Sequence, residues 1–194
     1  MALLIDWGGV LTTSMLDSFD AFSRREGVDV RTAFREDARA RAALVDLETG
    51  TIDLPTFERR LAQALGVDAH DLADRLTREV RPDHEMLDAV RGFHDQGVPT
   101  ALVSNSWRAE DYDVDDLFDV IVLSASLGVR KPDPRIYQHA ADRLAIPTAE
   151  CVFVDDLGGN LKPAKALGMA TIRHTAASST IPQLKRLLSP SDPS

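Results

Sequence analysis

The sequence has little cysteine: one residue, Cys151, among 194. A single cysteine excludes an internal disulfide framework and is typical of proteins kept in a reducing compartment, so we expect a cytoplasmic protein. Cys151 lies in an apolar run, where we expect a buried structural thiol rather than a reactive one.

Long hydrophobic runs are also absent. No apolar stretch approaches the roughly 20 residues that are needed to span a bilayer. The apolar run near residue 1 is interrupted by Asp6 and has no basic leader, so it does not have the pattern of a signal peptide. These features predict a protein without a membrane-spanning helix.

Positive charge is scarce relative to negative charge. The 22 Lys and Arg residues face 31 Asp and Glu residues, which gives a formal net charge of −9. Nucleic acids and anionic membranes both bind basic surfaces, so neither is an expected partner. A phosphorylated ligand would have to be held by local groups that work against the overall negative field.

What the chain does have is the composition of an ordinary globular protein, with 44% hydrophobic and 27% charged residues. Its length fits one large domain, or one domain with a substantial insertion. Five short apolar runs punctuate the chain. From the second run onward helical patterns separate them, which predicts an α/β fold with a parallel sheet. The runs are residues 2–5, 100–103, 120–123, 151–154 and 170–172.

A long stretch between the first two runs breaks this rhythm. Its apolar residues recur at helical spacing, and Asp53 is expected to cap one of its helices, with Pro55 in the first turn. We therefore expect a helical insertion at roughly residues 13–82, directly after the segment that carries Asp6. A helical lid in that position would cover the carboxyl end of the sheet.

Polar residues follow four of the apolar runs, close to the point where each run ends. Because the carboxyl ends of parallel strands meet at one edge of a sheet, we expect these side chains to converge in one crevice. The residues are Asp6, Ser104, Asn105, Lys131, Asp155 and Asp156.

Charge indicates what such a crevice would bind. Three neighbouring carboxylates repel one another, and one lysine cannot balance them, whereas a divalent ion restores neutrality. Oxygen ligands suit Mg²⁺, and a ligand matched by Mg²⁺, a lysine, and hydroxyl or amide donors is a phosphate. The sequence therefore predicts a Mg²⁺-dependent site for a phosphorylated substrate.

Each side chain then has a role in this hypothesis. Asp6 would attack phosphorus and form an aspartyl-phosphate. Ser104 and Asn105 would donate hydrogen bonds to phosphoryl oxygens, and Lys131 would balance the charge of the nucleophile. Each signal has a plainer alternative, since the carboxylates can cap turns or helices, Ser104-Asn105 can be a turn, and Lys131 can lie in a solvated loop. Only the combination, at successive strand ends, favours a site.

These motifs resemble, in their order along the chain, the four motifs of the haloacid dehalogenase-like superfamily. They are residues 6–12, Ser104-Asn105, Lys131-Pro132 and residues 155–169. Residues 131–172 are especially similar to the N-terminal phosphatase domain of soluble epoxide hydrolases. The resemblance covers essentially the whole chain.

The resemblance implies a doubly wound, Rossmann-like parallel sheet, with the first strand between the second and the fourth. It also implies a helical cap of the first type, inserted after strand 1. The implied core is residues 1–12 and 83–194, and the implied cap is residues 13–82.

The resemblance also implies the roles of the site residues. Asp6 would be the nucleophile, Ser104 a phosphate ligand with Asn105 beside it, and Lys131 the neutralising cation. The implied Mg²⁺ ligands are the Asp6 carboxylate, the main-chain carbonyl of Gly8 and Asp156, with Asp155 alongside.

Gly8 is a departure from the family pattern. Phosphatases of this family usually carry a second Asp two residues after the nucleophile, as general acid and later as base. Gly8 can offer its carbonyl to Mg²⁺ but cannot move a proton, and general acid–base help is worth ~10²–10⁴-fold. We therefore expect slow turnover, substrates with good leaving groups, or a proton relay from elsewhere. Trp107 is expected in a core or cap contact, with pocket lining as the alternative.

Two other interpretations stay open. Gly8 favours a regulatory protein that binds metal and phosphate without catalysis. A 2-haloacid dehalogenase also lacks the second Asp, but it lacks the acidic pair too, so Asp155-Asp156 disfavours it. The expected partner is a small phosphorylated substrate, and the chain is expected to be a monomer or homodimer.

Overall fold

Five parallel strands form the sheet in the described part of the chain, residues 1–107 and 116–188 of a computed structural model. The strands are β1 (Ala2–Ile5), β2 (Thr100–Ser104), β3 (Val120–Leu123), β4 (Cys151–Asp155) and β5 (Ala170–Arg173). Their order is β3-β2-β1-β4-β5, so β1 lies between β2 and β4. The α/β fold is as the apolar runs predict, and the central place of the first strand is as the resemblance implies.

The described residues form ten α-helices, of which six lie between β1 and β2 and four follow β3. They are α1 (Met15–Glu26), α2 (Val30–Glu36), α3 (Ala38–Glu48), α4 (Leu54–Leu65), α5 (Leu72–Thr77), α6 (His84–Asp95), α7 (Ser124–Leu127), α8 (Pro134–Leu144), α9 (Gly158–Ala166) and α10 (Ala177–Leu188). No helix of the described residues combines the length and the apolar character that crossing a membrane requires.

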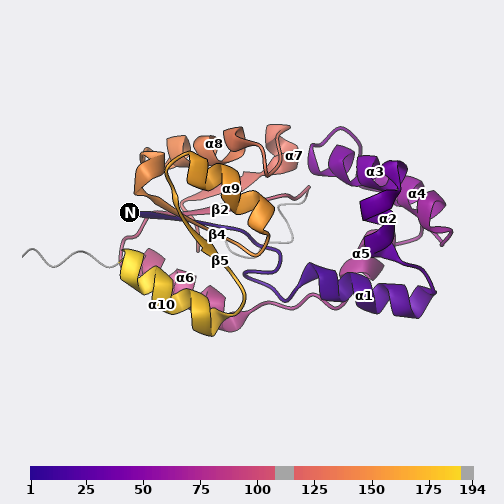
Figure 1. Ribbon diagram of the computed structural model, residues 1–194, viewed down its shortest axis with the longest axis horizontal. Coiled ribbons are helices and arrows are strands. Elements are labelled where there is room, and N and C mark those ends of the chain that lie inside the picture. Colours follow the sequence, from indigo (N-terminus) through magenta and orange to yellow (C-terminus); the bar gives the residue numbers. More distant parts are fainter. Residues whose placement is uncertain (108–115, 189–194) are drawn as a thin grey trace, which may run out of the picture.

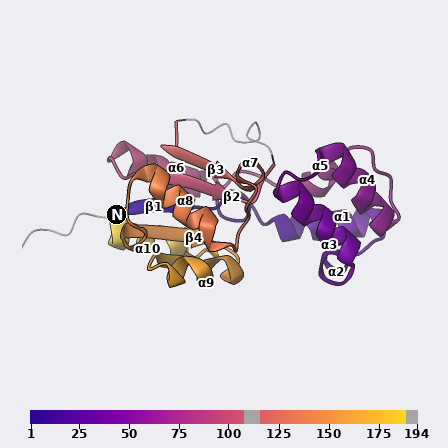
Figure 2. The same ribbon diagram turned by 90° about the horizontal axis from the view of Figure 1, so that it is seen from above.

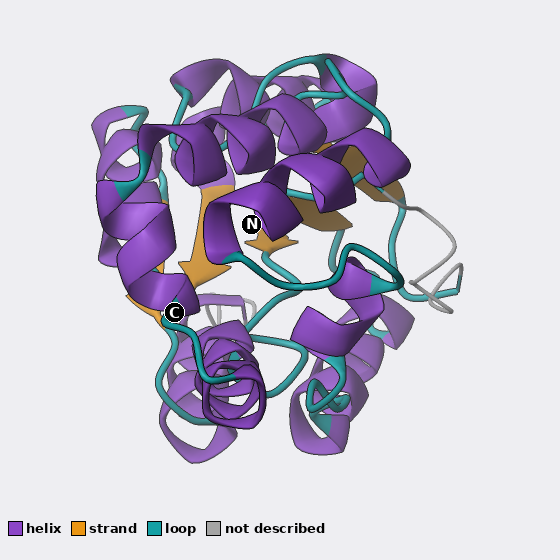
Figure 3. Ribbon diagram, turned by 90° about the vertical axis from the view of Figure 1, so that its right-hand side faces the viewer, coloured by secondary structure: helices purple, strands orange, loops and turns teal. Residues whose placement is uncertain are grey.

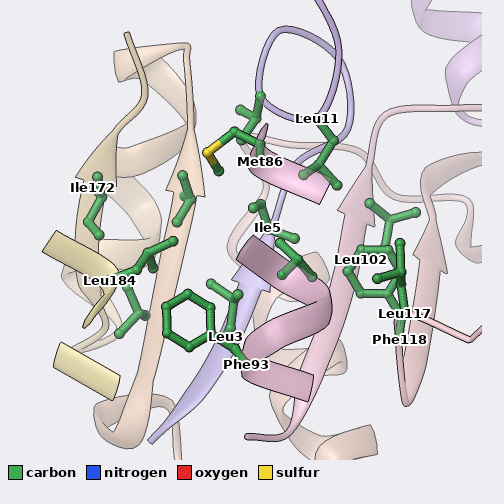
Figure 4. Close-up of a cluster of buried hydrophobic side chains, with 14 of the residues drawn as sticks. Leu3, Ile5, Leu11, Met86, Phe93, Leu102, Leu117, Phe118, Ile172 and Leu184 are labelled. Atoms are coloured by element: carbon green, nitrogen blue, oxygen red, sulfur yellow. The ribbon is translucent and has the colours of Figure 1, made fainter. Parts of the chain in front are cut away.

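Both faces of β1 are buried, because successive side chains of a strand point to opposite faces of the sheet. Leu3 and Ile5 pack with side chains from α6 and α10, as Figure 4 shows. Ala2 and Leu4 pack on the other face with α8 and α9. This two-sided burial explains why the strand is continuously apolar, and Figures 1 and 3 show the helices that enclose the sheet.

Helices α1 to α5, called here the α1–α5 layer, pack around an apolar cluster of their own. Phe22, Leu47, Phe57, Leu61 and Leu72 are among its buried side chains. Figures 1 and 2 show this layer beside the edge of the sheet at which the strands end. Asp53 caps α4 as expected, because its side chain accepts a hydrogen bond from the Thr56 N–H at 2.9 Å.

The segments that enter and leave the α1–α5 layer pair with each other. Thr13 N–H donates to the Arg81 carbonyl at 2.8 Å, and Asp83 N–H donates to the Leu11 carbonyl at 2.9 Å. The chain therefore crosses between the sheet and the α1–α5 layer through two backbone segments that are hydrogen-bonded to each other.

Candidate active site

The loop after β1 places Asp6 at the carboxyl ends of the parallel strands. Asp6 N–H donates to the Val154 carbonyl at 3.0 Å, which continues the pairing with β4 by one residue. The carbonyl of Trp7 then accepts from Leu11 N–H at 2.9 Å, so the backbone of residues 7–11 closes into a turn. The Asp6 side chain is thereby fixed directly beyond the strand end.

Lys131 joins the carboxylates of two strands. Its Nζ lies 2.7 Å from Asp6 Oδ1 and 2.8 Å from Asp155 Oδ2. The lysine side chain is only 1% exposed, and Asp155 is fully buried. The structure therefore brings together the ends of β1 and β4 and the loop after β3.

Asp155 and Lys131 are each held by a second group. The Asn160 amide donates to both oxygens of Asp155, at 3.1 and 3.0 Å, and the Leu157 N–H donates to Oδ1 at 2.8 Å. Asn105 accepts from the Lys131 N–H at 2.8 Å and donates to the Lys131 carbonyl at 3.1 Å. Asn105, expected as a phosphate donor, thus holds the backbone of Lys131. Ser104, buried at the end of β2, keeps the position expected for it.

The Asp156 carboxylate completes an acidic cluster. Asp6, Asp155 and Asp156 each offer an oxygen, and these oxygens lie within 4.8 Å of one another. Gly9 makes room for this arrangement, since a Cβ on it would lie 2.6 Å from Asp156 Oδ2 and its φ is +75°. Close carboxylate oxygens are ligands that Mg²⁺ prefers, so the donor set fits the expected metal.

Burial shapes the charge of this cluster. Burial, together with the neighbouring Asp155, raises the pKa of Asp6 to about 7, against the opposing effect of Lys131. Burial and the neighbouring Asp155 also raise the pKa of Asp156. Burial alone would lower the pKa of Lys131, but the Asp6 and Asp155 charges outweigh it and the pKa is raised. Lys131 is therefore protonated, and a further cation would favour the ionised carboxylates.

Gly8 stands at the tip of the loop with space around it. A Cβ built on Gly8 would meet only the Cε of Met15, at 3.9 Å, which is ordinary van der Waals contact. The backbone there is not in the left-handed region that favours glycine. The fold of this loop therefore does not require glycine at residue 8.

Two contacts at the rim of the site connect it to the α1–α5 layer. Trp107, on the loop after β2, packs against the apolar cluster of the layer, with its ring centroid 6.2 Å from that of Phe57, so the expected contact is confirmed. Glu48 pairs with Arg130, Oε2 to Nε at 2.8 Å. Sequence reasoning missed this pair, because neither residue lies in a motif that marks it.

Comparison with known proteins decides the family. The model of the haloacid dehalogenase-like hydrolases matches residues 1–168. The chain belongs to this hydrolase family. The resemblance carried by the motifs is thereby confirmed.

Two curated relatives illustrate the range of the family around this hydrolase. Bifunctional epoxide hydrolase 2 of Rattus norvegicus is 34% identical over 113 residues, which cover 53% of this chain and 20% of that protein. Sesquiterpene phosphatase astK of Aspergillus oryzae is 31% identical over 151 residues, 73% of this chain and 76% of that protein. The hydrolase thus matches only about a fifth of the length of the epoxide hydrolase.

A solved structure agrees with the fold. A haloacid dehalogenase-family enzyme from Bacteroides thetaiotaomicron, in complex with magnesium and inorganic phosphate, has a TM-score of 0.70 and 23% sequence identity. The match covers 90% of this chain and 94% of that one. The likeness shows that the two chains share one fold.

Proposed function

We propose that this hydrolase is a Mg²⁺-dependent phosphatase that acts on a small phosphorylated metabolite through an aspartyl-phosphate. The acidic cluster carries the proposal: oxygens of Asp6, Asp155 and Asp156 lie within 4.8 Å of one another, and Lys131 contacts two of the three residues. Three carboxylates and one ammonium leave a formal charge of −2, which one divalent cation balances. The phosphatase relative and the magnesium- and phosphate-bound neighbour support the same activity.

The proposed metal ligands are the Asp6 carboxylate, the Gly8 carbonyl and Asp156, with Asp155 beside them. Bound Mg²⁺ would hold phosphoryl oxygens against the nucleophile and offset the charge that develops on them. Asp155 is already engaged by Lys131, and we assign it chiefly to holding that ammonium.

The chain's own groups account for two steps. A carboxylate oxygen of Asp6 attacks phosphorus, and the bond from phosphorus to the leaving oxygen breaks. Lys131 balances the carboxylate. Ser104 is proposed to donate to a phosphoryl oxygen, and so is the N–H of the Asn105 amide that does not bond the Lys131 carbonyl. Water then attacks phosphorus, which releases inorganic phosphate and the free Asp6 carboxylate. Gly8 supplies no proton to the leaving oxygen, so slow turnover or a good leaving group is part of the proposal.

The α1–α5 layer is proposed to be the cap of this site, with residues 13–82 as the cap and residues 1–12 and 83–194 as the core. The paired backbone at residues 11–13 and 81–83 supports these boundaries, since it forms the two crossings between the parts. We also propose a cytoplasmic location from the single cysteine, and a monomer or homodimer.

A regulatory protein that binds metal and phosphate is the second candidate, and Gly8 is the observation that favours it. Such a protein would accept a phosphoryl group on Asp6, or bind phosphate, without turnover. A 2-haloacid dehalogenase is a weaker candidate, because the acidic pair Asp155-Asp156 has no part in that chemistry.

The test is hydrolysis of p-nitrophenyl phosphate by the purified protein, with and without Mg²⁺. We expect Mg²⁺-dependent release of nitrophenol, and a fall to the background rate in Asp6→Asn, which keeps the shape of the side chain. Asp20→Asn, which changes an exposed carboxylate in α1, is the matched control and should keep the wild-type rate. Activity that is unchanged in Asp6→Asn would exclude the proposed nucleophile, and phosphorylated Asp6 without turnover would favour the regulatory protein.

A further inference from the structure

The turn between α3 and α4 touches the sheet side of the molecule at three points. The Glu48 carboxylate pairs with Arg130, and the Glu48 carbonyl accepts a hydrogen bond from Ser124 Oγ. Gly50 has a φ of +69° and approaches so closely that a Cβ on it would lie 2.5 Å from the Ala125 carbonyl oxygen. Only glycine fits there, so this approach is a built contact.

These contacts continue to the loops that carry the site. Arg130 immediately precedes Lys131, whose ammonium joins Asp6 and Asp155. Ser124 Oγ accepts from Ser106 N–H at 3.0 Å, and Ser106 belongs to the loop that directly follows Ser104, the last residue of β2. One residue of the α1–α5 layer, Glu48, is therefore linked to both loops.

The Glu48–Arg130 ion pair is largely shielded from solvent. The side chain of Glu48 is 11% exposed and that of Arg130 is 29% exposed. Removing one partner of a buried pair leaves the other charge uncompensated, which costs more than breaking an exposed pair. The cost would fall on the residue next to Lys131.

We propose that Glu48 and Arg130 are positioning residues, through which docking of the α1–α5 layer sets the loop that carries Lys131 and the loop that follows Ser104. Neither residue touches the reacting atoms. The layer, when docked, holds the Arg130 side chain through Glu48, while Asn105 holds the backbone of the next residue, Lys131. Undocking would loosen both loops together. The functional part of this inference rests on the proposed phosphatase activity, but its structural part does not.

The test is amide hydrogen exchange of the metal-free full chain, resolved by residue with NMR, at a pH of about 8, where Glu48 is ionised because its pKa is raised to about 7. In Glu48→Gln we expect exchange at Lys131 and Ser106 to rise roughly tenfold, between the effects typical of exposed and buried ion pairs. Exchange at Leu4, in the central strand, reports global opening and should change less. Glu48→Gln with Arg130→Gln should exchange no faster than either single variant, because both changes break one pair.

Asp46→Asn is the matched control. Asp46 also lies in α3 and pairs with an arginine, Arg60, at 2.9 Å, but that pair lies within the α1–α5 layer. It should leave exchange at Lys131 and Ser106 unchanged. Equal rises at Lys131, Ser106 and Leu4, or additive effects in the double variant, would overturn the proposal.

Turnover gives a second and separate readout. If the protein hydrolyses p-nitrophenyl phosphate, Glu48→Gln should lower kcat/KM by roughly tenfold, since a small displacement of a catalytic group is costly. Asp46→Asn should not lower it. Wild-type kcat/KM in Glu48→Gln contradicts the positioning role, whereas an inactive wild type bears only on the proposed function and leaves the exchange test in force.

Discussion

Residue 8 is the position at which the site carries the least side-chain chemistry. Asp6, Lys131 and Asp156 supply charge around the proposed phosphoryl group, but Gly8 has no group that can protonate the leaving oxygen. A Cβ built on Gly8 would lie 3.9 Å from Met15 Cε, so the loop has room for a Cβ at this position. The missing proton donor is therefore a chemical difference rather than a demand of the fold.

Gly8→Asp should raise the rate, and more so for poor leaving groups. General acid–base help is typically worth ~10²–10⁴-fold, so we expect kcat for an alkyl phosphate to rise by roughly 10²-fold and that for p-nitrophenyl phosphate to rise less. Gly8→Asn has nearly the same shape without the acid and is the control. Equal kcat values in Gly8→Asp and Gly8→Asn, measured with an alkyl phosphate, would show that proton transfer is not the limitation.

The contact between helices α8 and α9 helps to orient the Asp155 carboxylate. Tyr137 of α8 is fully buried, and its hydroxyl donates to the Asn160 carbonyl in α9 at 2.7 Å. The Asn160 side chain in turn holds both oxygens of Asp155. The hydrogen bond between α8 and α9 therefore stabilises the position of Asn160, which holds the Asp155 carboxylate at the end of β4.

Tyr137→Phe should lower both the free energy of unfolding and the affinity for Mg²⁺. Loss of the hydroxyl leaves the Asn160 carbonyl without its buried donor, which costs about 1 kcal/mol or somewhat more. Thr148→Val is the control, since Thr148 Oγ1 donates to Leu167 at the other end of α9, at 2.7 Å. Urea unfolding should show losses in both variants, and calorimetric titration with Mg²⁺ a loss only in Tyr137→Phe. Unchanged Mg²⁺ affinity in Tyr137→Phe would show that the hydrogen bond from Tyr137 to α9 does not influence the metal site.

The strands were easier to predict from the sequence than the short helices. Continuous apolar runs mark β1 and β4 because both faces of those strands are covered. The helices α2, α5 and α7 have only 7, 6 and 4 residues, too few for a period of 3.6 residues to stand out.

Buried carboxylates lower the stability of the metal-free protein. Burial raises the pKa of Asp6 and of Glu48 to about 7, from 3.8 and 4.5. Between these values the folded chain holds protons that the unfolded chain has released. The contribution of these two groups to the free energy of unfolding therefore falls as pH rises from about 4 to about 7. Mg²⁺, which binds only the folded chain in this account, would oppose the fall.

Asp6→Asn should remove part of this pH dependence. Because asparagine cannot ionise, the variant should be more stable than the wild type above pH 7 without metal, and it should gain less from Mg²⁺. Urea unfolding in EDTA and in Mg²⁺, at a series of pH values from about 4 to 8, gives both quantities. Asp20→Asn, in an exposed ion pair with Arg31, serves as control. If the free energy of unfolding of Asp6→Asn changed with pH as steeply as that of the wild type, the result would contradict the burial of an ionisable Asp6.

The convergence of site residues could be predicted because it follows from topology. Parallel strands bring their carboxyl ends to one edge, and the described structure places Asp6, Lys131, Asp155 and Asp156 together there. The contact of Glu48 with Arg130 could not be predicted, because it depends on how the α1–α5 layer sits on the sheet. The engagement of Asn105 with the Lys131 backbone depends likewise on the path of a loop.

The proposed phosphatase activity depends on the transfer of the phosphoryl group to Asp6, and trapping of the phosphorylated protein tests this transfer. The protein is mixed with p-nitrophenyl phosphate and Mg²⁺, quenched in acid within the first turnover, digested, and analysed by mass spectrometry. We predict a hydroxylamine-sensitive phosphoryl group on the peptide that contains Asp6, absent without Mg²⁺ and absent in Asp6→Asn. A phosphoryl group on another residue, or nitrophenol release with no phosphorylated peptide at any quench time, would contradict the account.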